Sequence, residues 1–261
     1  MRLDVYLFEY GYVQSRQRAK TLIEAGGVCI DGVDLKKPSY QIDENAVHAV
    51  KITDTLAYVG RGGQKLEAAL DAFGVDPRGM TAVDIGASTG GFTDCLLQRG
   101  AVRVFAVDSG ENQLAPKLAG DRRVVSIEHL NARTLAPAHL GGERIDLAVM
   151  DVSFISATYI LPQIPALFAG RGELVCLIKP QFEVGRSMLG KGGIVKSREA
   201  HEAAVLRVVD CACQLGFSLR GLIDSPIKGG DGNREFLAHF SYGTEDAGWT
   251  RQDVRTFMRK N

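Results

Sequence analysis

The chain has 261 residues, of which 45% are hydrophobic and 24% charged, a composition typical of globular proteins and not of disordered or fibrous ones. Lysine plus arginine and aspartate plus glutamate both number 31, so a nucleic-acid partner would need a local basic face. Five scattered cysteines without a CxxC pair argue against a disulfide framework or a zinc site. The sequence shows no signal segment and no apolar run of about 18 residues, which disfavours secretion and membrane insertion. We therefore expect a cytoplasmic protein without a metal.

Residues 1 to 57 carry the pattern of a small α+β domain. The predicted elements, in order, are helices over 3–7 and 15–25, a short strand and turn over 28–33, and a strand-like stretch near 47–52. Ser15 is the expected N-cap of the second helix, and Gly26-Gly27 ends it. Three glycines within residues 58 to 63 then interrupt the periodicity, which predicts a linker there.

Residues 64 to 261 alternate helical and strand patterns. Strands are predicted at 81–85, 102–107, 124–127, 145–150 and 174–178, after a helix with Leu66, Ala69, Leu70 and Phe73 on one face. This rhythm predicts an α/β, Rossmann-like domain with a mostly parallel sheet covered on both faces. Two further strands, 219–223 and 236–240, flank a glycine-rich loop and suit an antiparallel edge pair, and a terminal helix is expected from Thr250 onward.

A glycine-rich segment follows the first strand of this second domain, and an acid ends the next strand. Small residues let the backbone approach a ligand closely, and a carboxylate at the tip of the second strand can bind both hydroxyls of a ribose. The segment lacks the spacing of dinucleotide and P-loop motifs, which leaves S-adenosylmethionine as the expected cofactor and a glycine turn without a ligand as the alternative. The expected cofactor contacts are Asp84, Gly86, Ser88, Gly90, Gly91, Phe92 and Asp108.

Four charged residues are expected to meet at the carboxyl edge of the sheet. Asp151 and Lys179 follow neighbouring strands, Glu235 precedes the last strand, and Lys65 lies at the start of the helix before the first strand. A ribose hydroxyl is a poor nucleophile, and its attack on a sulfonium needs a positioned base but no metal. A neutral lysine can be that base, so we assign Lys179 as the base and the other three as positioning groups; for any single residue, an edge ion pair is the alternative.

These motifs resemble the TlyA family, also called hemolysin A-like proteins, which are RNA ribose methyltransferases with an FtsJ/RrmJ-like catalytic domain. The resemblance covers nearly the whole chain and rests on Ser15-Arg16 with Gly27-Val28 and on residues 61–66, 84–93, 131–133, 151–156, 179–183 and 232–236. It implies a catalytic tetrad of Lys65, Asp151, Lys179 and Glu235 and adds Asn131 and Asp151 to the cofactor contacts. It also implies methylation of the 2′-hydroxyl of ribosomal RNA cytidines. The short segment before the RNA-binding module is similar to the subgroup that modifies the large subunit, so we expect that target.

Basic residues of the first domain are candidates for RNA contact: Arg16, Arg18, Lys20, Lys36 and Lys37. Acids slightly outnumber bases over residues 1 to 57, so an ordinary solvated helix face is equally open on this ground alone. Resemblance to the RNA-binding module named after ribosomal protein S-four favours contact with ribosomal RNA or a ribosomal subunit. Aromatic residues are few, which favours recognition of structured RNA over single-stranded bases.

Other functions fit the sequence less well. A base N-methyltransferase is expected to have an Asn/Asp-Pro-Pro-aromatic motif where this chain has Asp151-Val152-Ser153-Phe154. A cytosine C5-methyltransferase needs a nucleophilic cysteine beside the cofactor, whereas Cys176 lies inside a predicted buried strand. A dehydrogenase would need its glycine fingerprint, and a pore-forming hemolysin would need a spanning segment. A non-catalytic RNA-binding or ribosome-assembly factor is the strongest rival.

Overall fold

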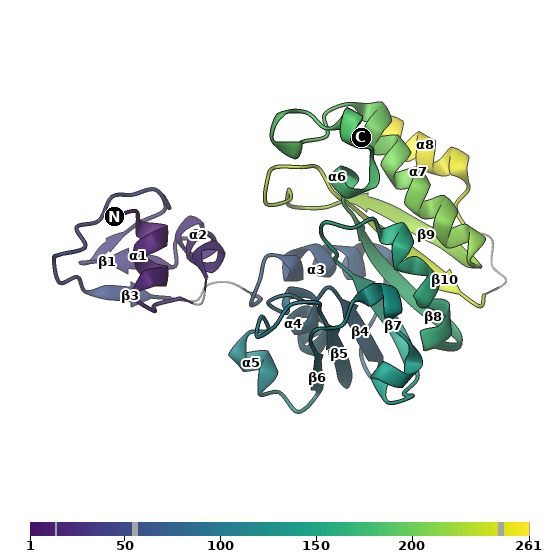
Figure 1. Ribbon diagram of the computed structural model, residues 1–261, viewed down its shortest axis with the longest axis horizontal. Helices are drawn as coiled ribbons and strands as arrows, with labels where there is room; N and C mark the ends of the chain where they lie inside the picture. Colours follow the sequence, from purple (N-terminus) through teal and green to yellow (C-terminus); the bar gives the residue numbers. More distant parts are fainter. Residues whose placement is uncertain (14, 54–56, 245–247, 261) are drawn as a thin grey trace. The chain divides into compact units, whose positions relative to one another are not determined.

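A computed structural model describes residues 1–13, 15–53, 57–244 and 248–260, and it divides into two compact units, Met1–Arg61 and Gly62–Asn261 (Figure 1). Residues 57 to 61 fold with the first unit. Helix α3 (Gly62–Phe73) begins the second, inside the stretch where the sequence predicts a linker.

The first unit packs two helices on a three-stranded antiparallel sheet. Its elements are α1 (Leu3–Glu9), α2 (Arg16–Glu24), β1 (Val28–Ile30), β2 (Val33–Asp34) and β3 (Val50–Ile52), with strand order β2-β1-β3. The Ser15 hydroxyl accepts a hydrogen bond from the backbone N–H of Arg18 at 3.1 Å, which confirms the predicted N-cap. Leu3, Leu7 and Ile23 are fully buried between the helices and the sheet, so this small unit has a core of its own.

The second unit is an α/β domain, as predicted. Its strands are β4 (Thr81–Ile85), β5 (Arg103–Val107), β6 (Val124–Ile127), β7 (Ile145–Met150), β8 (Phe168–Ile178), β9 (Phe217–Asp224) and β10 (Phe236–Tyr242). Its α-helices after α3 are α4 (Gly91–Gln98), α5 (Pro116–Ala119), α6 (Pro180–Glu183), α7 (Arg198–Gln214) and α8 (Arg251–Lys260). Short 3₁₀ helices lie at Ala132–Thr134, Pro137–Leu140, Ala157–Tyr159, Leu161–Gln163, Pro165–Leu167, Arg186–Met188 and Lys191–Gly193.

These strands form one seven-stranded sheet in the order β6-β5-β4-β7-β8-β10-β9. The first five are parallel, whereas β10 is antiparallel to both β8 and β9, so the predicted antiparallel edge pair is confirmed. Strand β8 begins six residues before the predicted strand, because residues 168–173 extend the pairing with β7 and β10.

Helices cover both faces of the sheet (Figure 1). Helices α3, α4 and α5 pack on one face, and α7 packs on the other together with the 3₁₀ turns that join β7 to β8. Strand β7 and residues 174–178 of β8 are buried on both sides, as their nearly continuous apolar sequences predict, and β4 is buried at four of its five positions. Within the described ranges, no helix is both long and apolar enough to cross a membrane.

Candidate active site

The loop between β4 and α4 has a backbone that requires glycine. Gly86 and Gly90 have φ angles of +88° and +90°, and Ser88 between them has +47°, all in the left-handed region. A Cβ on Gly86 would collide with the backbone carbonyl of Asp151, and a Cβ on Gly90 with the side chain of Leu118. The glycines therefore allow the loop to pass directly beside the end of β7.

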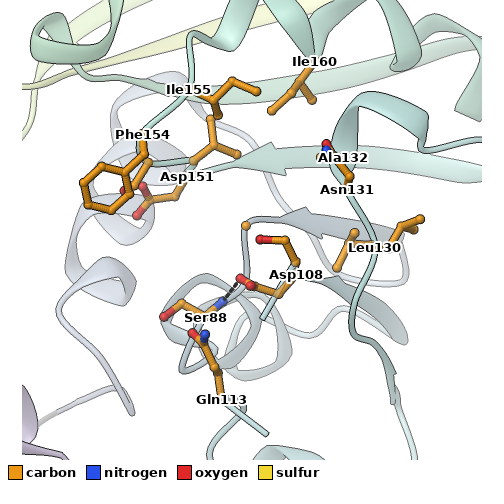
Figure 2. Close-up of a pocket in the computed structure, with 15 residues that line it drawn as sticks. Ser88, Asp108, Gln113, Leu130, Asn131, Ala132, Asp151, Phe154, Ile155 and Ile160 are labelled. Carbon is orange, nitrogen blue, oxygen red and sulfur yellow. Dashed lines mark hydrogen bonds between the residues drawn. The ribbon is translucent and has the colours of Figure 1, made fainter. Parts of the chain in front are cut away.

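A cavity of about 480 Å³ opens beside this loop, where β4, β5 and β7 end (Figure 2). The side chains drawn there converge from the ends of different strands, as expected for a ligand site in an open parallel sheet. Five of the predicted cofactor contacts line the cavity: Gly86, Ser88, Asp108, Asn131 and Asp151. Its volume is within the range of pockets that bind small ligands.

Asp108 lies in the cavity wall with its carboxylate held by backbone groups. The N–H of Ser88 donates to one oxygen at 2.8 Å (Figure 2). The N–H of Gly110 donates to the other at 2.7 Å. Each carboxylate oxygen can accept a second hydrogen bond. The side chain is thus fixed in orientation and keeps acceptor capacity on both oxygens, as the predicted ribose contact requires.

Asp84 lies beneath the loop and is fully buried. The backbone N–H and the hydroxyl of Thr93 donate to its Oδ2 at 2.9 and 2.7 Å, whereas its Oδ1 has no hydrogen-bond partner among the described residues. Burial raises the pKa of this carboxyl to about 7, and the nearby carboxylates of Asp151 and Asp108 add to the rise. A buried acceptor without a partner costs about 1 to 3 kcal/mol.

The other predicted cofactor residues lie outside the cavity wall. Gly90 caps the N-terminus of α4, Gly91 is its first helical residue, and Phe92 is buried with 3% of its surface exposed. These three residues form the start of α4, which supports the glycine loop, and they do not line the cavity. The glycine loop and the oriented carboxylate of Asp108 together fit a ligand that carries a ribose.

The four charged residues form two ion pairs at the carboxyl edge of the sheet. Lys65 Nζ lies 2.5 Å from Glu235 Oε2, and both residues are buried, with 7% and 3% of their surfaces exposed. Lys65 comes from the first turn of α3 and Glu235 from the residue before β10, which are 170 positions apart in the chain. Burying two charges costs solvation energy, which this pairing offsets.

The second pair joins the ends of β7 and β8. Lys179 Nζ lies 2.5 Å from Asp151 Oδ1, and it donates a hydrogen bond to the Ser153 hydroxyl at 2.7 Å. Phe236 is opposite Ile178 in the β10–β8 ladder, so Glu235 and Lys179 also emerge at the same end of neighbouring strands. Asp151 lines the cavity, so Lys179 is one contact away from it.

Residues 58–242 match the FtsJ-like methyltransferase family, a range that includes the glycine loop and both ion pairs. The chain belongs to the FtsJ-like methyltransferase family. Residues 1–48 match the S4 domain. The two structural units of this methyltransferase thus correspond to two known domain types.

Similar proteins match this chain over nearly their whole length. Hemolysin A of Brachyspira hyodysenteriae is 43% identical over 92% of this chain and 99% of that protein. The 16S/23S rRNA (cytidine-2′-O)-methyltransferase TlyA of Mycobacterium tuberculosis is 42% identical over 94% of this chain and 91% of that protein. A solved structure from Streptococcus thermophilus is 41% identical with a TM-score of 0.79, over 100% of this chain and 94% of that one.

The basic residues predicted to contact RNA in the S4 domain differ in whether their side chains already bind other groups of the protein. Arg18 donates to the backbone carbonyls of Tyr58 and Val59, so it holds the chain that leaves the domain, and Arg16 forms an ion pair with Asp4 at 3.3 Å. Lys36 and Lys37 are exposed and Lys20 is half-buried. The arginines therefore have structural contacts, and the three lysines stay accessible to a polyanion.

Sequence reasoning missed Ser153 and Glu183 in the methyltransferase domain. Glu183, on α6, accepts hydrogen bonds from the Ser156 hydroxyl at 2.5 Å and from the Ala157 backbone N–H at 2.7 Å. Burial raises its pKa. This carboxyl ties the segment after Asp151 to the segment after Lys179. Ser153 lies in the motif at 151–156 after β7, and Glu183 lies in the motif at 179–183 after β8. Their place in these motifs could have identified them as candidate site residues.

Several side chains of the cavity were also missed. Gln113, Leu130 and Ile155 line it, and the ring of Phe154 stands at its rim with 92% of its surface exposed and a φ of +65°.

Cys176 is fully buried inside β8, and this burial raises the pKa of its thiol. A protonated, buried thiol does not act as a nucleophile. No cluster of three His, Cys, Asp or Glu side chains suitable for a metal occurs among the described residues.

Proposed function

We propose that this protein transfers the methyl group of S-adenosylmethionine to the 2′-hydroxyl of a cytidine in ribosomal RNA, with the large subunit as the favoured target. The observation that carries the proposal is the Lys179–Asp151 pair at the edge of a cavity that Asp151 itself lines. The S4 domain and the ribosomal RNA specificity named for the mycobacterial relative support the choice of RNA. Such a substrate implies action in the cytoplasm.

In the cavity, the residues of the β4–α4 loop would hold the cofactor. Asp108 would accept hydrogen bonds from its ribose hydroxyls, and Gly86 and Ser88 would let the backbone approach it. Asn131 lies in the opposite part of the wall (Figure 2). When bound, S-adenosylmethionine supplies a methyl group on a positively charged sulfur, which leaves as a neutral thioether.

Lys179 would act as the general base in its neutral form. Its Nζ accepts the proton of the ribose 2′-hydroxyl while the hydroxyl oxygen attacks the methyl carbon. Asp151 and Ser153 hold the amine in position, and the Asp151 carboxylate stabilises the ammonium that forms. The buried Lys65–Glu235 pair keeps the start of α3 and the start of β10 in register with this centre.

Mapping 2′-O-methyl groups in ribosomal RNA from cells with and without the gene tests this function. We expect one cytidine of the large subunit to lose its methyl group, and restoration by the wild-type gene but not by a Lys179→Ala gene. Unchanged methylation in both subunits would contradict the proposal. Restoration of ribosome assembly by the Lys179→Ala gene, with no methyl group affected, would instead indicate the non-catalytic assembly factor.

A further inference from the structure

A second cavity, of about 470 Å³, is lined in part by Glu235 and shares no lining residue with the cofactor cavity. Its wall is formed by the segment that ends at Val195 and by the loop between β9 and β10. Glu235 also forms the ion pair with Lys65. The cavity therefore adjoins the proposed catalytic centre.

Hydrogen bonds hold the two walls of this cavity together. The buried side chain of Asn233 accepts from the backbone N–H of Val195 at 3.0 Å and donates to the carbonyl of Gly193 at 3.2 Å. The loop is closed on itself by a bond from the N–H of Gly229 to the carbonyl of Asn233 at 2.9 Å. The two walls of the cavity are therefore fixed relative to each other, because the buried Asn233 amide links them.

The chemistry of the lining suits a nucleobase with a phosphate beside it. Ile194, Val195, Pro226 and Ile227 give it an apolar part, and Lys228 is a basic residue of the same wall. Arg234 also lies in this wall, but its guanidinium is paired with Asp224 at 2.6 Å. Apolar surface can cover the face of a base, and basic side chains can contact the phosphate backbone. The volume suits one nucleotide better than a large ligand.

Charge around this cavity also favours a polyanion. Residues 184–196 and 224–235 contain five basic and three acidic side chains, although the whole chain has a net charge of zero. Two of the three acids are already paired, Glu235 with Lys65 and Asp224 with Arg234. These loops lie next to a ribose bound at Lys179, because Lys179 and Glu235 leave neighbouring strands at the same end.

We propose that this second cavity is a subsite for a nucleotide that flanks the methylated cytidine, with its base between Ile194 and Ile227 and its phosphate near Lys228. The proposal rests on the function proposed above. It assigns to residues outside the tetrad the task of placing the target ribose, since a base held here fixes the strand on one side of the reacting hydroxyl.

The test uses RNA fragments that span the mapped cytidine and that the wild-type protein methylates, each with one abasic ribose at a different flanking position. We expect one flanking abasic site to lower kcat/KM about tenfold in the wild-type protein. The Ile227→Trp variant fills the cavity, so it should methylate the intact fragment poorly and respond less than twofold to the same abasic site. Val102→Trp, at the amino end of β5, is the matched control and should behave like the wild type.

A flat response of the wild-type protein to every flanking abasic site, with normal methylation of the intact fragment, would overturn the subsite alone. An equal response of Ile227→Trp and the wild type would also overturn it. If thermal unfolding shows that Ile227→Trp does not fold, Ile194→Phe takes its place. The response of the wild-type protein to the flanking abasic sites still decides whether the subsite exists. Failure of the wild type to methylate any ribosomal RNA would overturn the proposed function itself.

Discussion

Replacement of Lys179 separates two roles that its position allows, a base and a fixed positive charge. Its Nζ contacts Asp151 at 2.5 Å and Ser153 at 2.7 Å, and 11% of the side chain is exposed. Lys179→Ala removes both roles. Lys179→Arg keeps a positive charge beside Asp151, but a guanidinium stays protonated and cannot accept a proton.

The expected magnitude follows from the proton that must leave the ribose hydroxyl. A positioned base contributes about 10² to 10⁴ in rate, which is about 3 to 5 kcal/mol of barrier. Lys179→Ala and Lys179→Arg should both lose this factor. Ser153→Ala removes one neutral hydrogen bond and leaves the Asp151 contact, so it should lose only about fivefold.

The assay is single-turnover methylation with excess enzyme, which measures the chemical step and not product release. Calorimetry with S-adenosylmethionine and thermal unfolding provide the controls, because an unpaired Asp151 could disturb the site. Near-normal single-turnover rates for Lys179→Arg would refute the reasoning. Lys179 would then be an electrostatic group, and the proton would pass to another acceptor or to solvent.

Three further outcomes are expected. Asp108→Ala should weaken S-adenosylmethionine binding by about 1.5 to 3 kcal/mol in calorimetry, because it removes charge-assisted hydrogen bonds to the ribose; unchanged affinity would contradict its role. Replacing Lys20, Lys36 and Lys37 by Gln should reduce the salt slope of RNA binding in filter binding by about 0.7 to 0.9 for each phosphate that is no longer neutralised, without unfolding the domain; an unchanged slope would mean that another face binds RNA. Asp84 has a pKa of about 7 when folded, above its unfolded value, so its contribution to stability is full below about pH 4 and is lost as the pH rises through 7. Unliganded Asp84→Asn protein should therefore gain stability relative to the wild type over that range in thermal unfolding, and a constant difference would show that Asp84 does not titrate there.

The local pattern was sufficient for most elements of this fold. The strand at 81–85 has β-branched or apolar residues at four of its five positions and is bounded by glycine turns, so its limits were predicted as observed. Ser15 could be recognised as an N-cap because the capping hydrogen bond spans only three residues. The carboxyl ends of the parallel strands could be located in the same way, and Asp108, Asp151 and Lys179 follow them directly.

Tertiary structure alone decided which charged groups meet. The sequence places Lys65, Asp151, Lys179 and Glu235 at one edge, but their separation into Lys65–Glu235 and Lys179–Asp151 depends on the strand order and on the β10–β8 register. The same holds for Glu183, whose partners are 26 and 27 positions away. Side-chain pairing over such separations is set by packing, so the periodicity of a segment carries no information about it.

The second cavity and the accessible basic surface were likewise invisible in the sequence. Asn233 looks like a loop residue until its amide is seen to join Val195 and Gly193. Arg16 and Arg18 resemble the neighbouring lysines in sequence, yet Asp4 and two backbone carbonyls occupy their guanidinium groups. The sequence by itself therefore determined the two domains, the glycine loop and the chemical types at the sheet edge. Only the folded chain decided their partners, because hydrogen bonds and ion pairs form between groups that folding, and not chain order, brings within about 3 Å.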